Sequence, residues 1–370
     1  MPKHKPLPAD QSVRVLRLRL KDKHASWLRE LAREVNLVWN YVNDLSFKVW
    51  ERERRFVSAF DLHPYVKGAS NAGLNLHSQT LQAVTEEFVT RRKQFKKLKL
   101  RWRVSNPKRS NYSLGWIPFK AVALRYKAGQ VWFGGRALSL WDSYGLAHYD
   151  LGPGNLCEDA RGRWYLNVSV KVKKVARPVE ALSSEALGID LGLKDLMVGS
   201  SGLKVQAQQF YRDLEPQLAV AQRAHKKARV RALHAKIANR RKDALHKLST
   251  RLVSQYQAIF VGNVNACALA QTGMAKSVLD AGWSTFRTML KYKCDDAGAW
   301  FAQVNEAYSP PDCHLCGTRC GPLGLEGLAV RRWTCTGCGA EHDRDENAAQ
   351  NIKQRGLEWL KKEFAAAPAR

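Results

Sequence analysis

Four cysteines near the end of the chain constrain its fold more than any other feature. They form two Cys-x-x-Cys pairs separated by eighteen residues, namely Cys313, Cys316, Cys335 and Cys338. A tight turn lets each pair supply two thiolates, and four thiolates complete the tetrahedral shell that Zn²⁺ prefers. We therefore predict one structural zinc ion on these four residues, with Cys320 as a bystander. The alternative of two disulfides is disfavoured because five of the eight cysteines fall within one 26-residue window.

The charge balance predicts a polyanionic partner. The 370 residues include 61 lysines and arginines against 33 acidic residues, which gives a net charge of +28. Nucleic acid is the simplest such partner, and a membrane surface is the other. No apolar run is long enough to span a bilayer, and residues 1–6 lack the apolar core of a secretory signal. Clustered cysteine pairs without an export signal predict a reducing compartment, the cytoplasm.

Apolar periodicity in the first half predicts helices inserted into a small barrel. A strand is expected at residues 12–20, helices at 26–54 and 75–100, and short strands between turns over 112–172. Ser78 is the expected cap of the second helix. Strands separated by tight turns predict an antiparallel barrel that includes strand 12–20. Residues 174–186 are predicted to be a linker.

The second half predicts an α/β domain. Residues 187–198 are expected to form two strands joined at Gly192, and further strands are expected at 258–265 and 302–308. Helices are expected at 221–251, at 279–299 and after Asp345. Asp190, at the end of the first strand, could simply cap a turn. Together with a second, distant acid at Asp345 it suggests an RNase H-like fold, in which such acids hold divalent ions.

Two segments are strongly basic. In the first we predict that the following residues contact nucleic acid: Arg91, Arg92, Lys93, Lys96, Lys97, Arg101, Trp102 and Arg103. The second, residues 221–251, holds eleven lysines and arginines with a single acid, and here we predict contacts from Arg240, Arg241 and Lys242. The alternatives are a solvated face and, for the second segment, a membrane surface. Its apolar stripe lacks a Trp or Phe anchor, which favours nucleic acid.

Taken together, these motifs resemble the TnpB family. The resemblance lies in Leu-Gly-Ile-Asp190-Leu-Gly, the basic helix, the paired Cys-x-x-Cys, and Asp343-Arg-Asp345-Glu-Asn-Ala-Ala-Gln-Asn351-Ile. TnpB proteins are RNA-guided nucleases encoded by small bacterial transposons and are related to the type V CRISPR effectors. The resemblance extends over nearly the whole chain and is strongest over residues 187–352.

The resemblance implies an α+β multidomain architecture. It places a β-barrel wedge domain at residues 1–24 and 101–180, interrupted by a helical recognition lobe at 25–100. A RuvC-like nuclease domain with an RNase H-like fold follows at 181–308 and 344–370, interrupted by a zinc ribbon at 309–343. The implied partners are a guide RNA and double-stranded target DNA, with a transposase as a genetic associate. The implied reaction is DNA cleavage by two-metal hydrolysis with Mg²⁺.

One of the three acids implied by the resemblance is missing. Asp190 and Asp345 carry over, but the strand that usually ends in Glu in relatives has Gly262 followed by Asn263. We predict that Glu306 replaces the missing acid, because an RNase H-like sheet places strand five beside strand four. Asn263 could add a neutral oxygen.

Three alternatives to this hypothesis stay open. Glu306 could end its strand and pair with a cation. The chain could then be an RNA-guided DNA-binding protein that no longer cuts. It could also be a zinc-ribbon nucleic-acid-binding protein without a guide, which would leave Asp190 and Asp345 unexplained.

Overall fold

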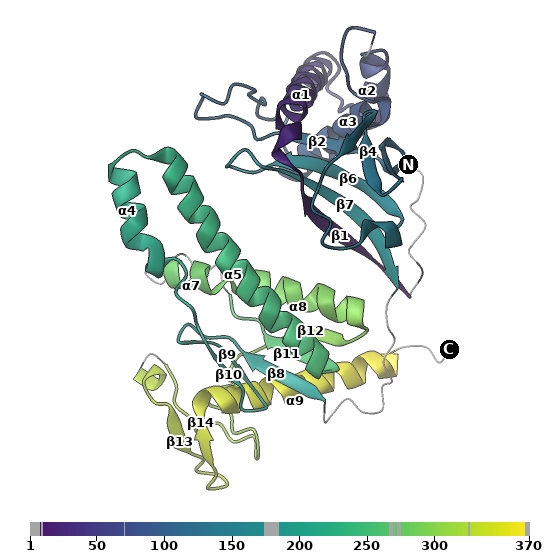
Figure 1. Cartoon of the computed structure of the whole chain (residues 1–370). Helices are drawn as coiled ribbons and strands as arrows, with labels where there is room; N and C mark the ends of the chain where they lie inside the picture. Colours follow the sequence, from purple (N-terminus) through teal and green to yellow (C-terminus); the bar gives the residue numbers. More distant parts are fainter. Residues whose placement is uncertain are drawn as a thin grey trace. The chain divides into compact units, whose positions relative to one another are not determined.

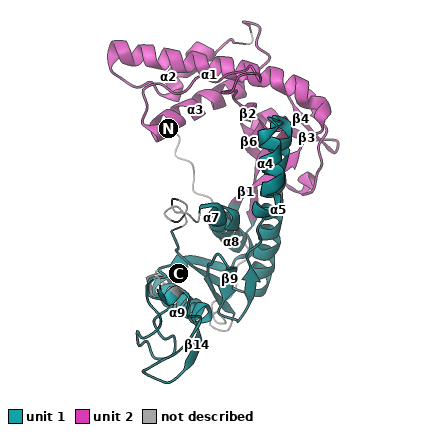
Figure 2. Cartoon of the chain, turned by 90° about the vertical axis from the view of Figure 1, so that its left-hand side faces the viewer, with its two compact units in different colours: residues 1–12, 173–370 teal, residues 13–172 magenta. Residues whose placement is uncertain are grey.

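The computed structural model describes residues 8, 10–69, 71–173, 185–265, 269, 271, 275–324 and 326–366. Most of the predicted linker, residues 174–184, lies outside this part of the chain. The chain has a mixed α/β fold with several sheets and helices, as predicted (Figure 1). It divides into two compact units, residues 13–172 and residues 1–12 with 173–370 (Figure 2).

The first unit packs three helices against two small sheets. The sheets have the strand orders β1-β7-β6-β2 and β3-β4-β5. The helical elements are η1 (Asp22–His24), α1 (Ala25–Glu53), α2 (Ala59–Val66), α3 (Ser78–Phe95), η2 (Ala121–Ala123) and η3 (Leu146–His148). The strands are β1 (Gln11–Arg19), β2 (Trp116–Phe119), β3 (Leu124–Lys127), β4 (Gln130–Phe133), β5 (Arg136–Leu138), β6 (Leu151–Glu158) and β7 (Trp164–Lys173).

Hydrogen bonding places the strands of the predicted antiparallel barrel in two sheets. An antiparallel bridge between Leu20 and Leu140 links the end of β1 to the segment that follows β5. Strand β1 has one buried and one exposed face: the side chains of Leu16 and Leu18 are buried, whereas those of Val13 and Val15 are exposed. Helices and strands of residues 13–172 share one apolar core.

The second unit contains a five-stranded sheet with the order β10-β9-β8-β11-β12. Strands β8, β11 and β12 are parallel, whereas β9 and β10 run antiparallel to their neighbours. The strands are β8 (Ala186–Asp190), β9 (Asp195–Gly199), β10 (Lys204–Gln206), β11 (Ala258–Gly262), β12 (Trp300–Val304), β13 (Arg332–Thr334) and β14 (Glu341–Asp343). The helical elements are η4 (Arg212–Leu214), α4 (Glu215–Arg223), α5 (Lys227–Gln255), α7 (Ala275–Ala281), α8 (Trp283–Ala297), η5 (Glu326–Leu328) and α9 (Arg344–Ala366).

Helices cover both faces of this sheet. Alternate strand residues such as Ile189 and Val261 pack with α5 and α8, while Phe260 packs with α9 on the opposite face. Gly188 permits a very close approach of α9, since a Cβ built there would lie 2.1 Å from the carbonyl oxygen of Ala349. No other residue fits that position without moving the helix. Gly188, two residues before Asp190, therefore allows α9 to pack directly against β8.

Several predicted boundaries were wrong. The predicted helix 75–100 ends at Phe95, where Lys96 has a positive φ, and its cap is His77 instead of Ser78. The predicted helix 221–251 is split between α4 and α5 by a turn containing His225, which also has a positive φ. Gly282 likewise separates α7 from α8. Within the described part of the chain, no helix is both long enough and apolar enough to cross a membrane.

Candidate metal and nucleic-acid sites

Asp190 lies at the edge of the sheet where the parallel strands end. It is the last residue of β8, and it is half-buried. Because side chains alternate along a strand, Asp190 shares the α9-facing side with Gly188. Carboxyl ends of neighbouring parallel strands meet at one edge, so acids there can converge. This is the position that the sequence predicted for the first acid.

The carboxylate of Glu306 lies directly against Gly262. The pairing of Gly262 with Val304 confirms that the two strands are neighbours and parallel. The strand predicted at 302–308 ends earlier, at Val304, so Glu306 lies in the loop just beyond it. A Cβ built on Gly262 would lie 2.2 Å from a carboxylate oxygen of Glu306. The carboxylate thus occupies the place where a side chain at position 262 would begin.

The backbone around Asn263 holds this loop. The side-chain oxygen of Asn263 accepts a 3.3 Å hydrogen bond from the backbone N–H of Glu306. The backbone N–H of Asn263 donates to the carbonyl oxygen of Val304 at 3.1 Å. The backbone N–H of Val264 also donates to the Glu306 carboxylate. Gly262, by leaving room for the carboxylate, and Asn263, through its hydrogen bond, therefore both help to place Glu306.

Asp345 lies in the first turn of α9. The Asp343 carboxylate caps this helix, accepting from the N–H groups of Asp345 and Glu346, both at 3.1 Å. Asp345 forms ion pairs with Arg331 at 2.5 Å and with Arg344 at 3.1 Å. Both of its carboxylate oxygens are therefore engaged by guanidinium groups, which a bound cation would have to displace.

The three acids interact electrostatically. Burial raises the pKa of Asp190 to about 8, and the negative charges of Asp345 and Glu306 add to the rise. Burial also raises the pKa of Glu306 above its usual range. Carboxylates that repel one another in a half-buried site become stable together when a cation neutralises them. Carboxylate oxygens are the donors that a hard divalent ion prefers, and Asp190, Glu306 and Asp345 are named the acid trio below.

The raised pKa of Asp190 predicts a pH-dependent stability. The folded-state pKa of about 8 lies above the value of about 3.9 in an unfolded chain. The stabilising contribution of this carboxyl is therefore complete below about pH 4 and is lost as the pH rises through about 8. In buffer without divalent ions, Asp190→Asn should stabilise the protein against urea more at pH 8.5 than at pH 5. Asp243→Asn, at an exposed carboxylate, provides the background, and an equal effect of Asp190→Asn at both pH values would contradict the prediction.

The four predicted cysteines form a compact cluster. Their sulfur atoms all lie within 4.8 Å of one another. Cys313 Sγ and Cys338 Sγ are 3.8 Å apart, and Cys316 Sγ and Cys335 Sγ are 3.5 Å apart. Tetrahedral zinc with Zn–S bonds of about 2.3 Å requires sulfur separations of about 3.8 Å. The cluster is thus compatible with a zinc site.

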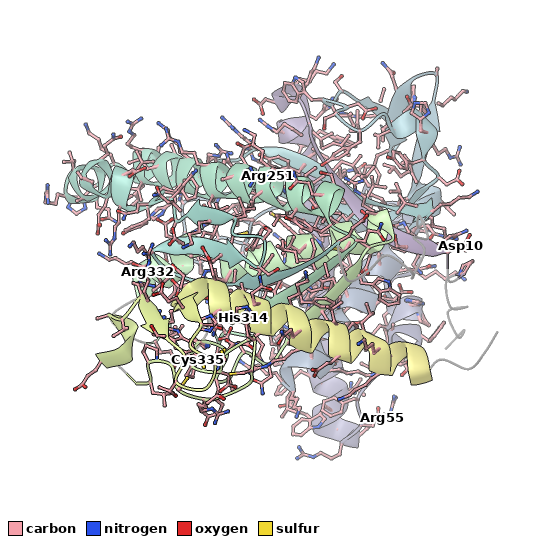
Figure 3. All side chains as sticks on the ribbon, turned by 90° about the horizontal axis from the view of Figure 1, so that it is seen from below. Asp10, Arg55, Arg251, His314, Arg332 and Cys335 are labelled. Carbon is pink, nitrogen blue, oxygen red and sulfur yellow. The ribbon has the colours of Figure 1, made fainter. Side chains whose placement is uncertain are left out.

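Cys320 stands apart from this group of four. Its sulfur atom approaches Cys335 Sγ to 3.4 Å, but the four-sulfur cluster does not include it. Figure 3 labels Cys335 in the predicted zinc-ribbon segment, residues 309–343, and His314 beside α9.

Sequence reasoning missed the side chains that attach the ribbon to α9. Asn347 and Asn351 are buried, and both donate hydrogen bonds to the carbonyl oxygens of Ser309 and Asp312. The buried imidazole of His342 lies beside the cluster, which the spacing of the cysteines did not reveal. The Asn-x-x-x-Asn spacing, one helical turn, was the signal that could have predicted this clamp.

His342 contacts the cysteine cluster, and His314 packs against His342 with ring centroids 5.0 Å apart. Nε2 of His342 lies 3.1 Å from Cys313 Sγ, so a neutral imidazole can donate its N–H to a metal-bound sulfur. The backbone N–H of His314 donates to the Asn347 side chain at 3.0 Å. The cysteine cluster and the helix that carries Asp345 are therefore connected through hydrogen bonds.

Three of the predicted nucleic-acid-binding arginines instead contact the protein interior. Arg92 is only 2% exposed, and its guanidinium donates to Ser46 and to the Val57 carbonyl oxygen, so its predicted surface position was wrong. Arg103 is half-buried and donates to Asn36 at 2.5 Å. Their charges hold helices and loops together.

Arg241 is likewise engaged, whereas most of the other basic positions are exposed. Arg241 donates to the carbonyl oxygen of Leu279 at 2.5 Å and lies 3.7 Å from Asp280. The exposed predicted residues are Arg91, Lys93, Lys96, Lys97, Arg101, Trp102, Arg240 and Lys242.

Comparison with solved structures defines the class of fold. The chain superposes on the protein of a Cas12f1–sgRNA–target DNA complex with a TM-score of 0.61, covering 93% of this chain and 99% of that one. The sequence identity is 11%, so the likeness concerns the fold alone. The mixed α/β fold is therefore similar to that of the Cas12f effectors.

Family models match two parts of the chain. Residues 167–272 match the OrfB_IS605 model, described as "Probable transposase", and residues 283–352 match the Cas12f1-like TNB domain. These matches agree with the resemblance to the TnpB family that the motifs indicated.

Several named relatives match about half of the chain or less. A Streptomyces pristinaespiralis protein named "Putative RNA-guided DNA endonuclease" is 40% identical over 54% of this chain and 51% of its own length. InsQ of Escherichia coli K12, with the same descriptive name, is 27% identical over 53% of this chain and 54% of its own. A relative named "CRISPR-associated DNA-binding protein Cas12m", from Allomeiothermus silvanus, is 31% identical over 32% of this chain and 23% of its own. The chain thus spans about half the length of the first two relatives.

Proposed function

We propose that this protein is an RNA-guided DNA endonuclease of the RuvC type. The observation that carries the proposal is that Asp190 ends β8 and the Glu306 carboxylate lies at the end of the neighbouring strand β11, while the charges of Glu306 and Asp345 both act on Asp190. The strand order β10-β9-β8-β11-β12 supports it, because it is the order expected of an RNase H-like nuclease. The names of the relatives supply the reaction class, a guide RNA and a DNA target.

In this proposal the acid trio would hold Mg²⁺, whose positive charge would allow a phosphodiester of the target strand to bind beside the carboxylates. Bound Mg²⁺ supplies activation of water for attack and stabilisation of the leaving oxygen. Asp190 provides a carboxylate from a rigid strand, and Glu306 supplies the one that Gly262 lacks. Asp345 joins them once its oxygens leave Arg331 and Arg344, whose guanidinium groups can then contact the phosphate.

The zinc ribbon has a positioning role in this mechanism. Asn347 and Asn351 tie residues 309–312 to α9, and α9 begins at the turn that carries Asp345. A folded ribbon would thereby keep Asp345 aligned with Asp190. The four thiolates leave no open coordination position, so zinc there supplies structure and not catalysis.

The proposal is tested by purifying the full chain from cells that also carry its flanking DNA and sequencing the RNA that co-purifies. The expected result is one enriched RNA with a constant scaffold and a variable end. Double-stranded DNA matching that end should then be cut with Mg²⁺ present and left intact in EDTA. Absence of any enriched RNA would overturn the proposal.

A second candidate is an RNA-guided DNA-binding protein that does not cut. Gly262 favours it, because the strand end that usually provides an acid provides none. The same preparation separates the two functions. Specific binding of the matched duplex without cleavage, at every Mg²⁺ or Mn²⁺ concentration tried, would establish the second candidate.

Basic residues on α5 provide a further prediction. Replacing exposed Arg240 and Lys242 with Ala should weaken RNA binding uniformly across sequences. The slope of log affinity against log salt should fall by about 1.5, because each lost phosphate contact accounts for about 0.7–0.9. Arg241→Ala is the matched comparison, and its main effect should be on stability, since Arg241 contacts Leu279. Equal salt slopes for the double variant and the wild type would refute this assignment.

A further inference from the structure

The first unit carries a hollow that plays no part in the proposed cleavage chemistry. Its volume is about 940 Å³, and it lies between the end of α3 and the segment 97–116. Small-ligand pockets measure roughly 300–1,000 Å³, so the hollow can admit a group as large as a nucleotide.

Aromatic side chains form much of its lining. Trp102 and Phe95 are 54% and 56% exposed, although both are large and apolar. Deeper in the hollow, Trp39 and Trp116 pack edge to face with ring centroids 6.1 Å apart. An accessible indole ring next to packed aromatic side chains provides a surface on which a flat ring can stack.

The segment that carries Trp102 is held rigidly. Asn43 binds the backbone of Leu100 twice, donating to its oxygen at 2.8 Å and accepting from its N–H at 2.9 Å. Asn40 binds the backbone of Arg103 in the same way, at 2.9 Å and 2.8 Å. Trp102 lies between these two clamps. Its exposure therefore belongs to an ordered segment, which lowers the entropic cost of binding a ligand there.

The rim of the hollow is positively charged. Arg91, Lys97 and Arg101 line it, and Glu87 pairs with Arg91 at 2.6 Å. Within the part of the chain that the structure describes, no ion pair engages Lys97 or Arg101. Two cations beside a stacking surface match a nucleotide, which joins a flat base to a phosphate.

Part of the lining of the hollow is polar. Ser110, Asn111 and Ser113 form this part. The hydroxyl oxygen of Ser113 accepts from the backbone N–H of Val104 at 3.0 Å, so the hydroxyl hydrogen can point to another acceptor. Groups that both donate and accept suit the ribose 2′-hydroxyl, which distinguishes RNA from DNA.

We propose that this hollow binds one unpaired nucleotide of an RNA strand. The base stacks on Trp102, the phosphate contacts Lys97 or Arg101, and the ribose faces the polar part of the lining. The inference deepens the proposed function and rests on its RNA-binding part. It adds a base-dependent contact to a surface otherwise expected to bind by charge alone.

Fluorescence anisotropy of the full chain, freed of co-purified nucleic acid in high salt, tests the inference. The probes are labelled strands of equal length: oligouridine, oligodeoxyuridine and an abasic ribose-phosphate strand. Wild-type protein should bind oligouridine most tightly. Trp102→Ala should weaken that binding by about 5- to 150-fold, the range for loss of one stacked base, and should abolish the preference over the abasic strand. Trp102→Phe should retain most of the affinity, which separates stacking from misfolding.

Trp141→Ala is the matched control. Trp141 is 53% exposed in the same unit and lies under Arg19, as Trp102 lies near Lys99, but it does not line the hollow. Its replacement should leave oligouridine affinity unchanged. Equal wild-type affinity for oligouridine and the abasic strand would overturn the pocket while leaving the proposed function intact. Equal or tighter binding of oligodeoxyuridine would overturn the RNA assignment, and binding of none of the strands would count against the proposed function as well.

Discussion

Replacing Glu306 with Gln is expected to lower the rate of DNA cleavage by about 10³-fold or more, nearly as much as Asp190→Ala. The physical reason is that a shared cation site loses one of three anionic donors, at a cost of several kcal/mol in transition-state stabilisation. Binding of guide RNA and of the matched duplex should persist, because Glu306 belongs to the acid trio and not to the basic surfaces. The measurement is single-turnover cleavage of matched duplex with Mg²⁺, alongside duplex binding in Ca²⁺.

Glu346→Gln is the matched control for this prediction. Glu346 lies next to Asp345 in sequence but pairs with Lys204 at 3.0 Å, so its loss should leave cleavage nearly unchanged. A wild-type cleavage rate for Glu306→Gln would disprove the relocation of the third acid.

The double variant Gly262→Glu with Glu306→Ala tests the geometry directly. Removing the Glu306 carboxylate vacates the position that a Cβ at 262 would need, although Ile352 remains 3.2 Å away. A carboxylate would then return to the strand end that usually carries it in relatives. The expected result is a partial recovery of cleavage relative to Glu306→Ala alone. No recovery would indicate that a carboxylate at position 262 cannot serve as the third acid of the site.

Replacing Cys335 with Ser is expected to release zinc and unfold the ribbon. Zinc contributes about 10–16 kcal/mol of apparent binding free energy to small structural sites, far more than the packing of two short strands can supply. Cleavage should fall with it, because residues 309–312 would no longer hold the first turns of α9. Zinc content by mass spectrometry and limited proteolysis over residues 313–343 provide the measurement.

Cys320→Ser supplies the control, since its sulfur lies outside the four-sulfur cluster. It should retain one zinc ion and wild-type resistance to protease. Retention of a full zinc ion by Cys335→Ser, or its absence from the wild-type protein, would contradict the assignment. Loss of zinc from Cys320→Ser would instead make that residue a ligand.

Local patterns in the sequence predicted many of the elements that position the site. The apolar repeat before residue 54 predicted α1 to within a residue at each end, and the two Cys-x-x-Cys pairs predicted the sulfur cluster. Turns were harder, because a single residue with positive φ, such as His225 or Lys96, ends a helix whose periodicity continues on both sides. The roles of the acid trio in cleavage stay a prediction, which the electrostatic influence of Glu306 and Asp345 on Asp190 supports.

The sequence by itself determined the cysteine cluster and the positions of Asp190 and Asp345 on their strand and helix. These features depend on spacing within a few turns of chain, where covalent geometry limits the distance between neighbours. Only the tertiary structure decided that Glu306 fills the place left open at Gly262 and that Arg92 is buried while Trp102 is exposed. Such outcomes depend on contacts between residues tens of positions apart, which side-chain packing selects and local spacing does not encode.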